Sequence, residues 1–340
     1  MSRLLTTSKY ENIGKLRTYQ NKIYMQNDYK LMQINKQGAV IKNFMIPTNN
    51  FIISEDFIYT INPRKYNIDI YENNTKLTSL TQHCGAINSL ALDKDSNSLY
   101  SGACDKTLKI WDMNTYQLIT SIMYSSRVYN VKIFNDKLYV ALERTEIKVY
   151  NIHTMENIMN FESKRTNRFI EITNDGKKLI SISRNSNYDN QIIIWDTQTG
   201  KKIFELEKSE ITRYTSTLLH NDILYLGVSE KIGKWECIND LKLFDIHTHK
   251  IIFQERVNEQ IESLCMCKNK LYTSERITNT LYIWDMNLYF TPTINCFKRL
   301  SEEWKNKIRL ISHIRERYDT LDYGLPPEIW FYILEMCRTI

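Results

Sequence analysis

The chain has 340 residues, of which 42% are hydrophobic and 25% are charged, with a formal net charge of +6. This composition is ordinary for a globular protein and excludes wholesale disorder. No apolar run is long enough to span a membrane as a helix, and the first residues lack an apolar segment of signal-peptide length, so we expect neither kind of segment.

The positive charge says little about nucleic acid because the whole composition is biased. The chain contains 44 Ile and 32 Asn but five Ala, as AT-rich codons would produce, and the same codons favour Lys. We therefore expect no nucleic-acid partner unless the charges cluster. The seven cysteines are odd in number and irregularly spaced, which favours a reducing, intracellular compartment (cytoplasm or nucleus) over a disulfide framework.

A repeated pattern of short strands runs along most of the chain. Seven alternating apolar runs have related ends, at Ile34, Tyr71, Trp111, Tyr150, Trp195, Phe244 and Trp284. The intervals between these ends are 37, 40, 39, 45, 49 and 40 residues. A period of about 40–45 residues with four short strands per unit is typical of propeller blades.

The clearest unit, residues 86–122, divides into four alternating segments. These are INSLAL, SLYSGA, TLKIWD and QLITSI, and polar turns separate them. The next unit repeats the order as VYNVKIF, KLYVALE, EIKVYN and ENIMNF. Short strands without helical periodicity between them predict an all-β fold.

With these runs, the chain resembles a WD-repeat β-propeller over residues 1–297. In that family a His, a Ser or Thr, an Asp and the Trp that ends the third strand form a hydrogen-bonded set. The resemblance assigns these roles to His83, Ser101, Asp105 and Trp111. A buried indole N–H needs an acceptor, which such a set supplies.

Seven third strands imply seven blades. Two weaker units keep part of the set, namely Ser181 with Trp195 and Thr273 with Trp284. The family closes its ring with an N-terminal strand in the last blade. Residues 3–8 (RLLTTS) or residues 288–297 (LYFTPTINCF) could close this ring, and the sequence leaves both open.

Arginines recur near the turns that share one face of a propeller. In phosphate-reading F-box/WD-repeat proteins, an arginine sits three residues after the second-strand Ser or Thr, and the resemblance places Arg184 and Arg276 there. Arg127 and Arg213 share a position just before first strands, and Arg165 and Arg168 lie in the neighbouring turn. Guanidinium groups bind oxyanions bidentately, so we expect a target that is phosphorylated or acidic. The alternative is scattered, solvated arginine in a basic chain.

Two connections on that face are enlarged, at residues 184–190 and 229–240. The second contains Trp235, which has no strand pattern around it. This Trp either folds back as a plug or contacts a partner, since Trp is frequent among interface anchors.

The periodicity changes after residue 297. Apolar residues recur at spacings of three and four between Leu300 and Tyr318, which predicts an amphipathic helix. Gly324 then breaks the chain, and Pro326-Pro327 would begin a second helix. We therefore expect two parts: a propeller of about seven blades over 1–297, and an α-helical tail over 298–340.

The string at 325–334 resembles the opening of an F-box, whose pattern is Leu-Pro-x-Glu-Ile-x-x-x-Ile-Leu. The matching residues are Leu325, Pro326, Glu328, Ile329, Ile333 and Leu334. In that family these residues begin the helical surface that docks on a Skp-type adaptor of a cullin ubiquitin ligase. The alternative is a pair of capping helices that packs on the chain's own propeller.

No catalytic motif is apparent. Cys265-x-Cys267 and His247-x-His249 each form half of a conceivable metal site, but we expect core cysteines and solvated histidines. The sequence therefore predicts a monomeric, non-enzymatic interaction protein without cofactor or metal. The resemblance implies a substrate receptor of a Skp-dependent cullin ubiquitin ligase, and the alternative is a generic WD-repeat scaffold with no ubiquitin role.

Overall fold

The structure, a computed structural model, describes residues 4–10, 13–27, 30–48, 50–62, 65–143, 146–163, 166–184, 190–207, 212–232, 236–275 and 277–286. The chain divides into two compact units, Leu4–Trp284 and a second that comprises Met1–Arg3 with Asp285–Ile340. The first unit contains all seven of the repeated apolar runs. The predicted helical tail and its boundary at residue 297 lie outside the described residues.

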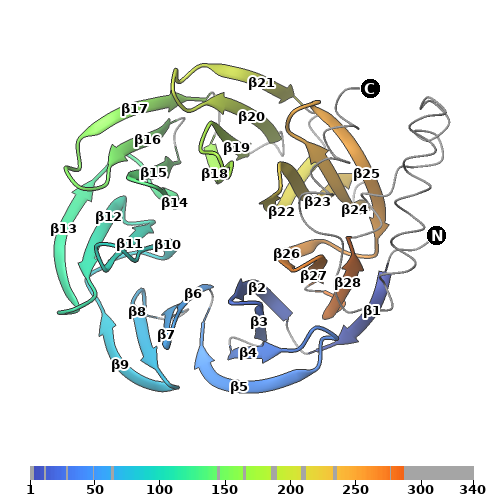
Figure 1. The fold of residues 1–340 in the computed structure, drawn as a ribbon, viewed down its shortest axis with the longest axis horizontal. Helices are drawn as coiled ribbons and strands as arrows, with labels where there is room; N and C mark the ends of the chain where they lie inside the picture. The colour runs from blue at the N-terminus through green and yellow to red at the C-terminus, as the bar shows by residue number, and fades with distance from the viewer. Residues whose placement is uncertain are drawn as a thin grey trace, which may run out of the picture. The chain divides into compact units, whose positions relative to one another are not determined.

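Seven four-stranded antiparallel sheets form a ring (Figure 1). We number these blades in chain order. Blade 1 contains β2 (Ile13–Tyr19), β3 (Lys22–Asn27), β4 (Lys30–Ile34) and β5 (Val40–Pro47). Blade 2 contains β6 (Asn50–Ser54), β7 (Phe57–Ile61), β8 (Ile68–Glu72) and β9 (Thr75–Leu80). Blade 3 contains β10 (Ile87–Asp93), β11 (Ser98–Ala103), β12 (Thr107–Asp112) and β13 (Gln117–Met123).

The remaining blades repeat this order from the centre outwards. Blade 4 contains β14 (Val128–Phe134), β15 (Lys137–Leu142), β16 (Glu146–Asn151) and β17 (Asn157–Glu162). Blade 5 contains β18 (Thr166–Ile172), β19 (Lys178–Arg184), β20 (Asn190–Asp196) and β21 (Lys202–Glu207). Blade 6 contains β22 (Thr212–His220), β23 (Ile223–Lys231), β24 (Cys237–Asp245) and β25 (Lys250–Val257). The all-β, seven-bladed propeller predicted from the sequence is confirmed.

Blade 7 is closed by the start of the chain. It contains β26 (Ile261–Cys267), β27 (Lys270–Glu275) and β28 (Thr280–Asp285), and β1 (Leu4–Lys9) pairs with β28 as its outer strand. Of the two closing segments left open by the sequence, the N-terminal one takes this place. Hydrogen bonds also join blade 7 to blade 1: the Ser274 hydroxyl donates to the Gly14 carbonyl (2.8 Å), and Leu16 N–H donates to Ser263 Oγ (3.0 Å).

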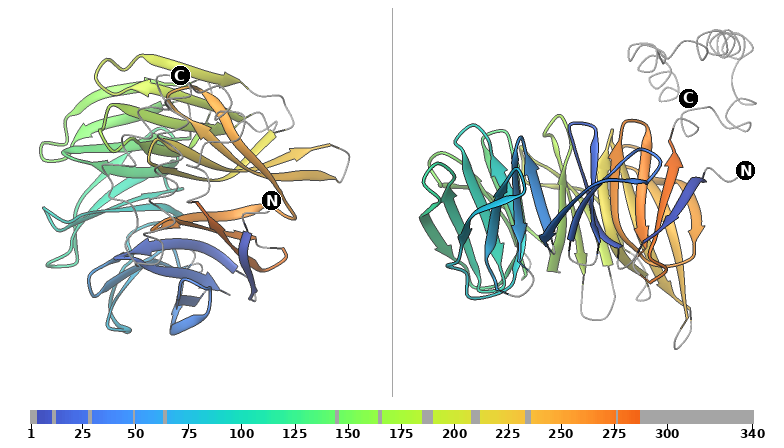
Figure 2. Two further views of the ribbon diagram at one scale, coloured as in Figure 1. Left: turned by 45° about the vertical axis from the view of Figure 1, so that its right-hand side comes forward. Right: turned by 90° about the horizontal axis from the view of Figure 1, so that it is seen from below.

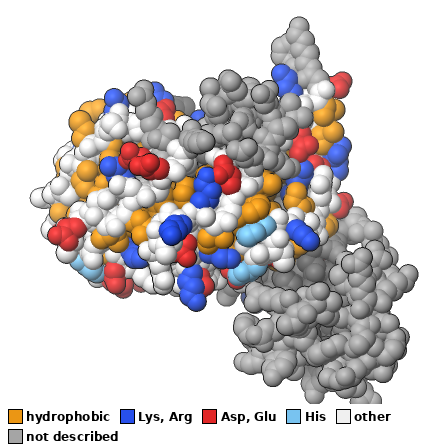
Figure 3. Space-filling model, turned by 90° about the horizontal axis from the view of Figure 1, so that it is seen from above, with side chains coloured by type: hydrophobic (Ala, Val, Ile, Leu, Met, Phe, Trp, Pro, Cys, Tyr) orange, Lys and Arg blue, Asp and Glu red, His pale blue; other side chains and the backbone are white. Residues whose placement is uncertain are grey.

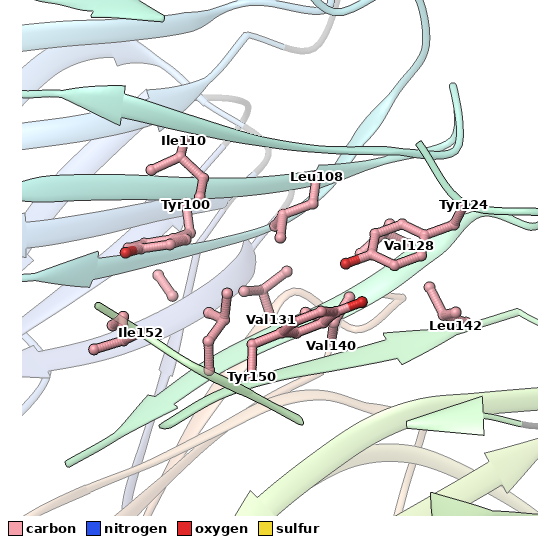
Figure 4. Packing of buried hydrophobic residues seen from close by; sticks show 12 residues of the cluster. Tyr100, Leu108, Ile110, Tyr124, Val128, Val131, Val140, Leu142, Tyr150 and Ile152 are labelled. Carbon is pink, nitrogen blue, oxygen red and sulfur yellow. The ribbon is translucent and has the colours of Figure 1, made fainter. Parts of the chain in front are cut away.

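Apolar clusters fill the spaces between blades, because each sheet buries both faces against its neighbours. Figure 4 shows one such cluster, in which Tyr100 and Leu108 of blade 3 meet Val131 and Tyr150 of blade 4. The packing is tight at Gly102, where an added Cβ would lie 2.3 Å from Cγ1 of Val128. The predicted alternation of the strands thus places the core between sheets.

The topology gives the ring two distinct faces, and both are visible edge-on in Figure 2. In an antiparallel blade, the turns after the first and third strands lie at one end, which we call the turn face. The connections after the second strand and between blades lie at the other end, which we call the crossover face. The arginines predicted to bind a target belong to the crossover face.

Each outer strand carries a β-bulge at the same position. The register skips one residue near the end of the third strand, and the skipped residues are Leu5, Ile41, Leu77, Ile119, Ile158, Ile203 and Ile252. The last six of these side chains are exposed. Figure 3 shows hydrophobic side chains along the rim that is uppermost in Figure 1. A bulge twists an open edge and so hinders its pairing with another sheet.

The enlarged connection predicted at 229–240 is mostly strand. β23 and β24 stay paired up to Lys231 and Cys237, which leaves only residues 232–236 between them. A partly buried polar network stabilises this extension: the buried Asp240 carboxylate accepts from Arg256 Nε (3.0 Å), and Lys242 pairs with Glu230 (2.9 Å). The prediction of a loop over the whole of 229–240 was wrong. Apolar residues do not alternate regularly in this segment, so it carries no strand signal.

Candidate protein-interaction face

The four residues of the predicted hydrogen-bonded set meet in blade 3. Trp111 Nε1–H donates to Ser101 Oγ (2.8 Å), and His83 Nε2 lies 2.8 Å from the same oxygen. His83 Nδ1 lies 2.7 Å from Asp105 Oδ2. The set therefore ties the connection before β10 to the second and third strands and to the turn between them.

The protonation states of this set follow from its surroundings. Burial lowers the pKa of His83 despite the nearby Asp105 carboxylate. Burial alone would raise the pKa of Asp105, but hydrogen bonds from Thr107, His83 and the Cys84 backbone hold it below its ordinary value. A neutral His83 that donates from Nδ1 and accepts at Nε2 satisfies both partners. This arrangement stabilises blade 3 and leaves no group free for chemistry.

Other blades keep less of the set. Trp195 Nε1–H donates to Ser181 Oγ (2.9 Å), and Trp284 Nε1–H donates to Thr273 Oγ1 (3.1 Å). In blade 4, Tyr124 precedes the first strand as His83 does in blade 3, and Tyr150 takes the register position of Trp111; both tyrosine rings lie in the apolar cluster of Figure 4. Blade 4 thus replaces hydrogen bonding with packing.

Glu275 in blade 7 is a residue that the sequence did not single out. It is fully buried, and its carboxylate accepts from the Glu259 backbone N–H (3.3 Å) and from Thr278 Oγ1 (2.8 Å). Burial raises its pKa. Glu275 therefore accepts from the backbone of the connection before its blade, as Asp105 does in blade 3. Asp105 lies in the turn after the second strand, whereas Glu275 is the last residue of β27, a position that no motif indicates.

Two of the predicted target-binding arginines lie near one tyrosine, Tyr129. Arg127 Nη1 is 3.8 Å from Glu143 Oε1, and the Tyr129 hydroxyl donates to the same oxygen (3.2 Å). The Arg168 guanidinium lies over the Tyr129 ring, 5.1 Å from its centroid. All four residues belong to the crossover ends of blades 4 and 5. Both arginines were predicted from the sequence, whereas Tyr129 and Glu143, which lie beside them, were missed.

Glu143 sets the electrostatics of this group. The carboxylate raises the pKa of Arg127, whose side chain remains half exposed. Arg168 has the aromatic ring as its partner, so its charge is not neutralised by a described carboxylate. A cation stacked on a ring keeps its N–H groups available for an anion.

The remaining predicted residues are only partly described. Arg213 is a half-buried residue near the start of β22 in blade 6, and Arg184 ends β19, with its side chain not described. Arg165, Trp235 and Arg276 lie outside the described residues. So do the residues predicted to bind an adaptor: Leu325, Pro326, Glu328, Ile329, Ile333 and Leu334.

The described residues contain no group of three or more His, Cys, Asp or Glu arranged to hold a metal ion. Within the same ranges, Cys84, Cys104, Cys237, Cys265 and Cys267 are free thiols, and the last two are buried. A helix of the length and apolarity needed to cross a membrane is likewise absent from the part of the chain described.

Comparison with known proteins agrees with this architecture. The family "WD domain, G-beta repeat" matches residues 74–112. The chain is 32% identical over 199 residues to the WD repeat-containing protein 89 homolog of Dictyostelium discoideum, which covers 52% of this chain and 51% of that protein. It is 23% identical over 169 residues to Transcription factor unc-37 of Caenorhabditis elegans, over 48% of this chain and 27% of that one.

A third relative is CCR4-associated factor 4 of Saccharomyces cerevisiae, 29% identical over 168 residues, or 47% of this chain and 22% of the relative. The chain thus spans about half or less of the length of these relatives. Among solved structures, the computationally designed Ika8 protein superposes with a TM-score of 0.62 at 16% sequence identity. The match covers 83% of this chain and 98% of the Ika8 chain. At this identity it supports the fold alone. The described residues thus form a seven-bladed β-propeller, a fold suited to protein interaction, with a WD repeat at residues 74–112 and similarity to WD-repeat proteins.

Proposed function

We propose that this chain is a substrate receptor of a Skp-dependent cullin ubiquitin ligase. The propeller selects a target protein, and residues 325–334 recruit the adaptor. The receptor does no chemistry itself. It raises the effective concentration of the target near the transferring enzyme.

Target selection rests on the arrangement of Arg127, Tyr129 and Arg168. Two guanidinium groups, one stacked on the Tyr129 ring and one paired with the neighbouring Glu143, present N–H donors and an apolar surface together. An acidic or phosphorylated peptide fits this pattern, because bidentate Arg–oxyanion pairs are strong and geometrically specific. Interface anchors are also frequently Tyr and Arg.

Adaptor recruitment rests on the sequence alone. All six specified positions of the F-box pattern occur between Leu325 and Leu334. A segment this apolar needs a partner surface, either its own or that of another protein. By its cysteine pattern we place the chain in a reducing compartment inside the cell.

An affinity pull-down that compares the full chain with a deletion of residues 324–340 tests adaptor recruitment and target selection separately. We expect the deletion to lose a Skp-type adaptor while it keeps propeller-dependent partners. A full chain with Arg127→Ala and Arg168→Ala should show the opposite pattern. Adaptor capture that is unchanged by the deletion contradicts the ubiquitin role and leaves a scaffold.

A further inference from the structure

The turn face carries a second charged feature, over the junction of blades 7 and 1. Four lysines lie in or beside the adjoining turns: Lys22, Lys36, Lys268 and Lys270. The first three are exposed and the last is half buried. None of them forms an ion pair within the part of the chain described.

Two contacts between the blades hold these turns together. Cys267 Sγ donates to the Asn21 carbonyl (3.4 Å), beside Lys22 and Lys268. The Tyr272 hydroxyl donates to the carbonyl of Lys36 itself (3.1 Å). The lysines of blade 1 are therefore fixed next to those of blade 7 by buried side chains and backbone.

The turns after β2, β4 and β26 contain amides in place of carboxylates, while Asp285 ends β28 at the same end of blade 7. Gln20, Asn21, Gln37 and Asn269 separate the lysines, and no Asp or Glu occurs between residues 13 and 27, between 30 and 48, or between 263 and 274. Elsewhere on the turn face, lysines share their turns with acids, as Lys177 does with Asp175 and Lys201 with Asp196. The blade 7/1 turns are thus locally cationic, with exposed amides that can donate hydrogen bonds to oxyanions.

The same face is acidic over blades 2 and 3. Glu55, Asp56 and Glu72 lie in or beside the turns of blade 2, and Asp95 lies in a turn of blade 3. A broad polyanion, such as a nucleic acid or an anionic membrane, would meet these carboxylates when it covered the lysines. A local acidic segment of a protein meets only the lysines, so charge complementarity favours a protein.

We propose that the lysine cluster of blades 7 and 1 (Lys22, Lys36, Lys268 and Lys270) is a docking site for an acidic segment of a partner protein. It lies on the opposite face from Arg127 and Arg168 and is independent of the ubiquitin role. One molecule could therefore hold two protein partners at once, one on each face.

Fluorescence anisotropy with a labelled oligoglutamate peptide tests the site on the full chain. We expect Lys36→Glu with Lys268→Glu to weaken binding by about tenfold or more and to flatten its dependence on salt. The matched control is Lys201→Glu with Lys250→Glu, which makes the same charge change at exposed lysines of the same face. That control should bind as the wild type does.

Four results would overturn the proposal. Two concern the lysines: unchanged oligoglutamate binding by the Lys36/Lys268 variant, or an equal loss of binding in the matched control. Two concern the occupant: tighter binding of oligothymidylate or phosphatidylserine vesicles than of oligoglutamate, or a dimer of the chain that the Lys36/Lys268 variant dissociates. Thermal melts of each variant, matched to the wild type, show that a loss of binding is not a loss of fold.

Discussion

The guanidinium carbon of Arg168 lies 5.1 Å from the centre of the Tyr129 ring, and the hydroxyl of the same tyrosine donates to Glu143, which also pairs with Arg127. This stack links blade 5 to blade 4 at the crossover face. It also predicts how the two arginines differ, because only Arg127 faces a carboxylate. Removing that carboxylate should free Arg127 for an incoming anion.

We therefore expect Glu143→Gln to strengthen binding of phosphorylated peptides and Arg168→Ala to weaken it, each by several-fold. A phosphopeptide array probed with purified chain measures both effects. Arg17→Ala is a suitable control, because this guanidinium bonds only to the Leu16 carbonyl and to Asn50 among the described residues. Equal binding by Glu143→Gln and the wild type would mean that Glu143 does not compete with the ligand.

Ser101 should matter more than its equivalent in blade 5. Ser101 joins both Trp111 and His83, whereas Ser181 bonds to Trp195 alone among the residues that the structure describes. Ser101→Ala leaves two buried groups without partners and should lower the free energy of unfolding by about 2–4 kcal/mol, against about 1–2 kcal/mol for Ser181→Ala. Urea denaturation compares the two, and an equal loss in both would contradict a linked set.

Glu275 should make stability depend on pH. Burial raises its folded-state pKa above the ordinary value of 4.5, so the protonated form is favoured in the fold. Its contribution is then fully present below pH 4.5 and is lost as the pH rises through the folded pKa. Glu275→Gln keeps an acceptor oxygen and should raise the melting temperature at neutral pH but not at low pH. A Tm difference that is constant with pH would contradict this.

Gly102 should tolerate no side chain. An added Cβ would lie 2.3 Å from Val128 Cγ1 and 2.9 Å from Val131 Cγ2, both in the next blade. We expect Gly102→Ala to cost about 1–3 kcal/mol through overpacking. Val128→Ala should recover part of that loss in the double variant, as thermal denaturation would show. Additive losses would place the strain elsewhere.

The fold was predictable because its signals are local and repeated. The runs that end at Trp111, Trp195 and Trp284 fix the period, and alternation marks the strands between them. Closure by β1 was not predictable, since two segments have a similar strand pattern and only the pairing with β28 distinguishes them. The extension of β23 and β24 was not predicted either. It is stabilised by polar pairs such as Asp240 with Arg256, which leave no apolar alternation in the sequence.

The candidate site was predictable only in part. Repeat alignment brought out Arg127, because it compares equivalent positions of different blades, and Arg168 was predicted from its place in the neighbouring turn. It could not find Tyr129 or Glu143, whose roles depend on contacts across strands and blades. Glu275 likewise acts through a backbone N–H sixteen residues away along the chain, a relation that no short motif encodes.

The most direct test of the proposed function is a calorimetric titration of a purified Skp-type adaptor into the full chain. We predict a stoichiometric complex that Ile333→Asp abolishes, because a charge would enter the apolar face of the box. Ile119→Asp, an equally drastic change at an exposed rim position, should bind the adaptor as the wild type does. No binding by the wild type, or equal binding by Ile333→Asp, would contradict the account.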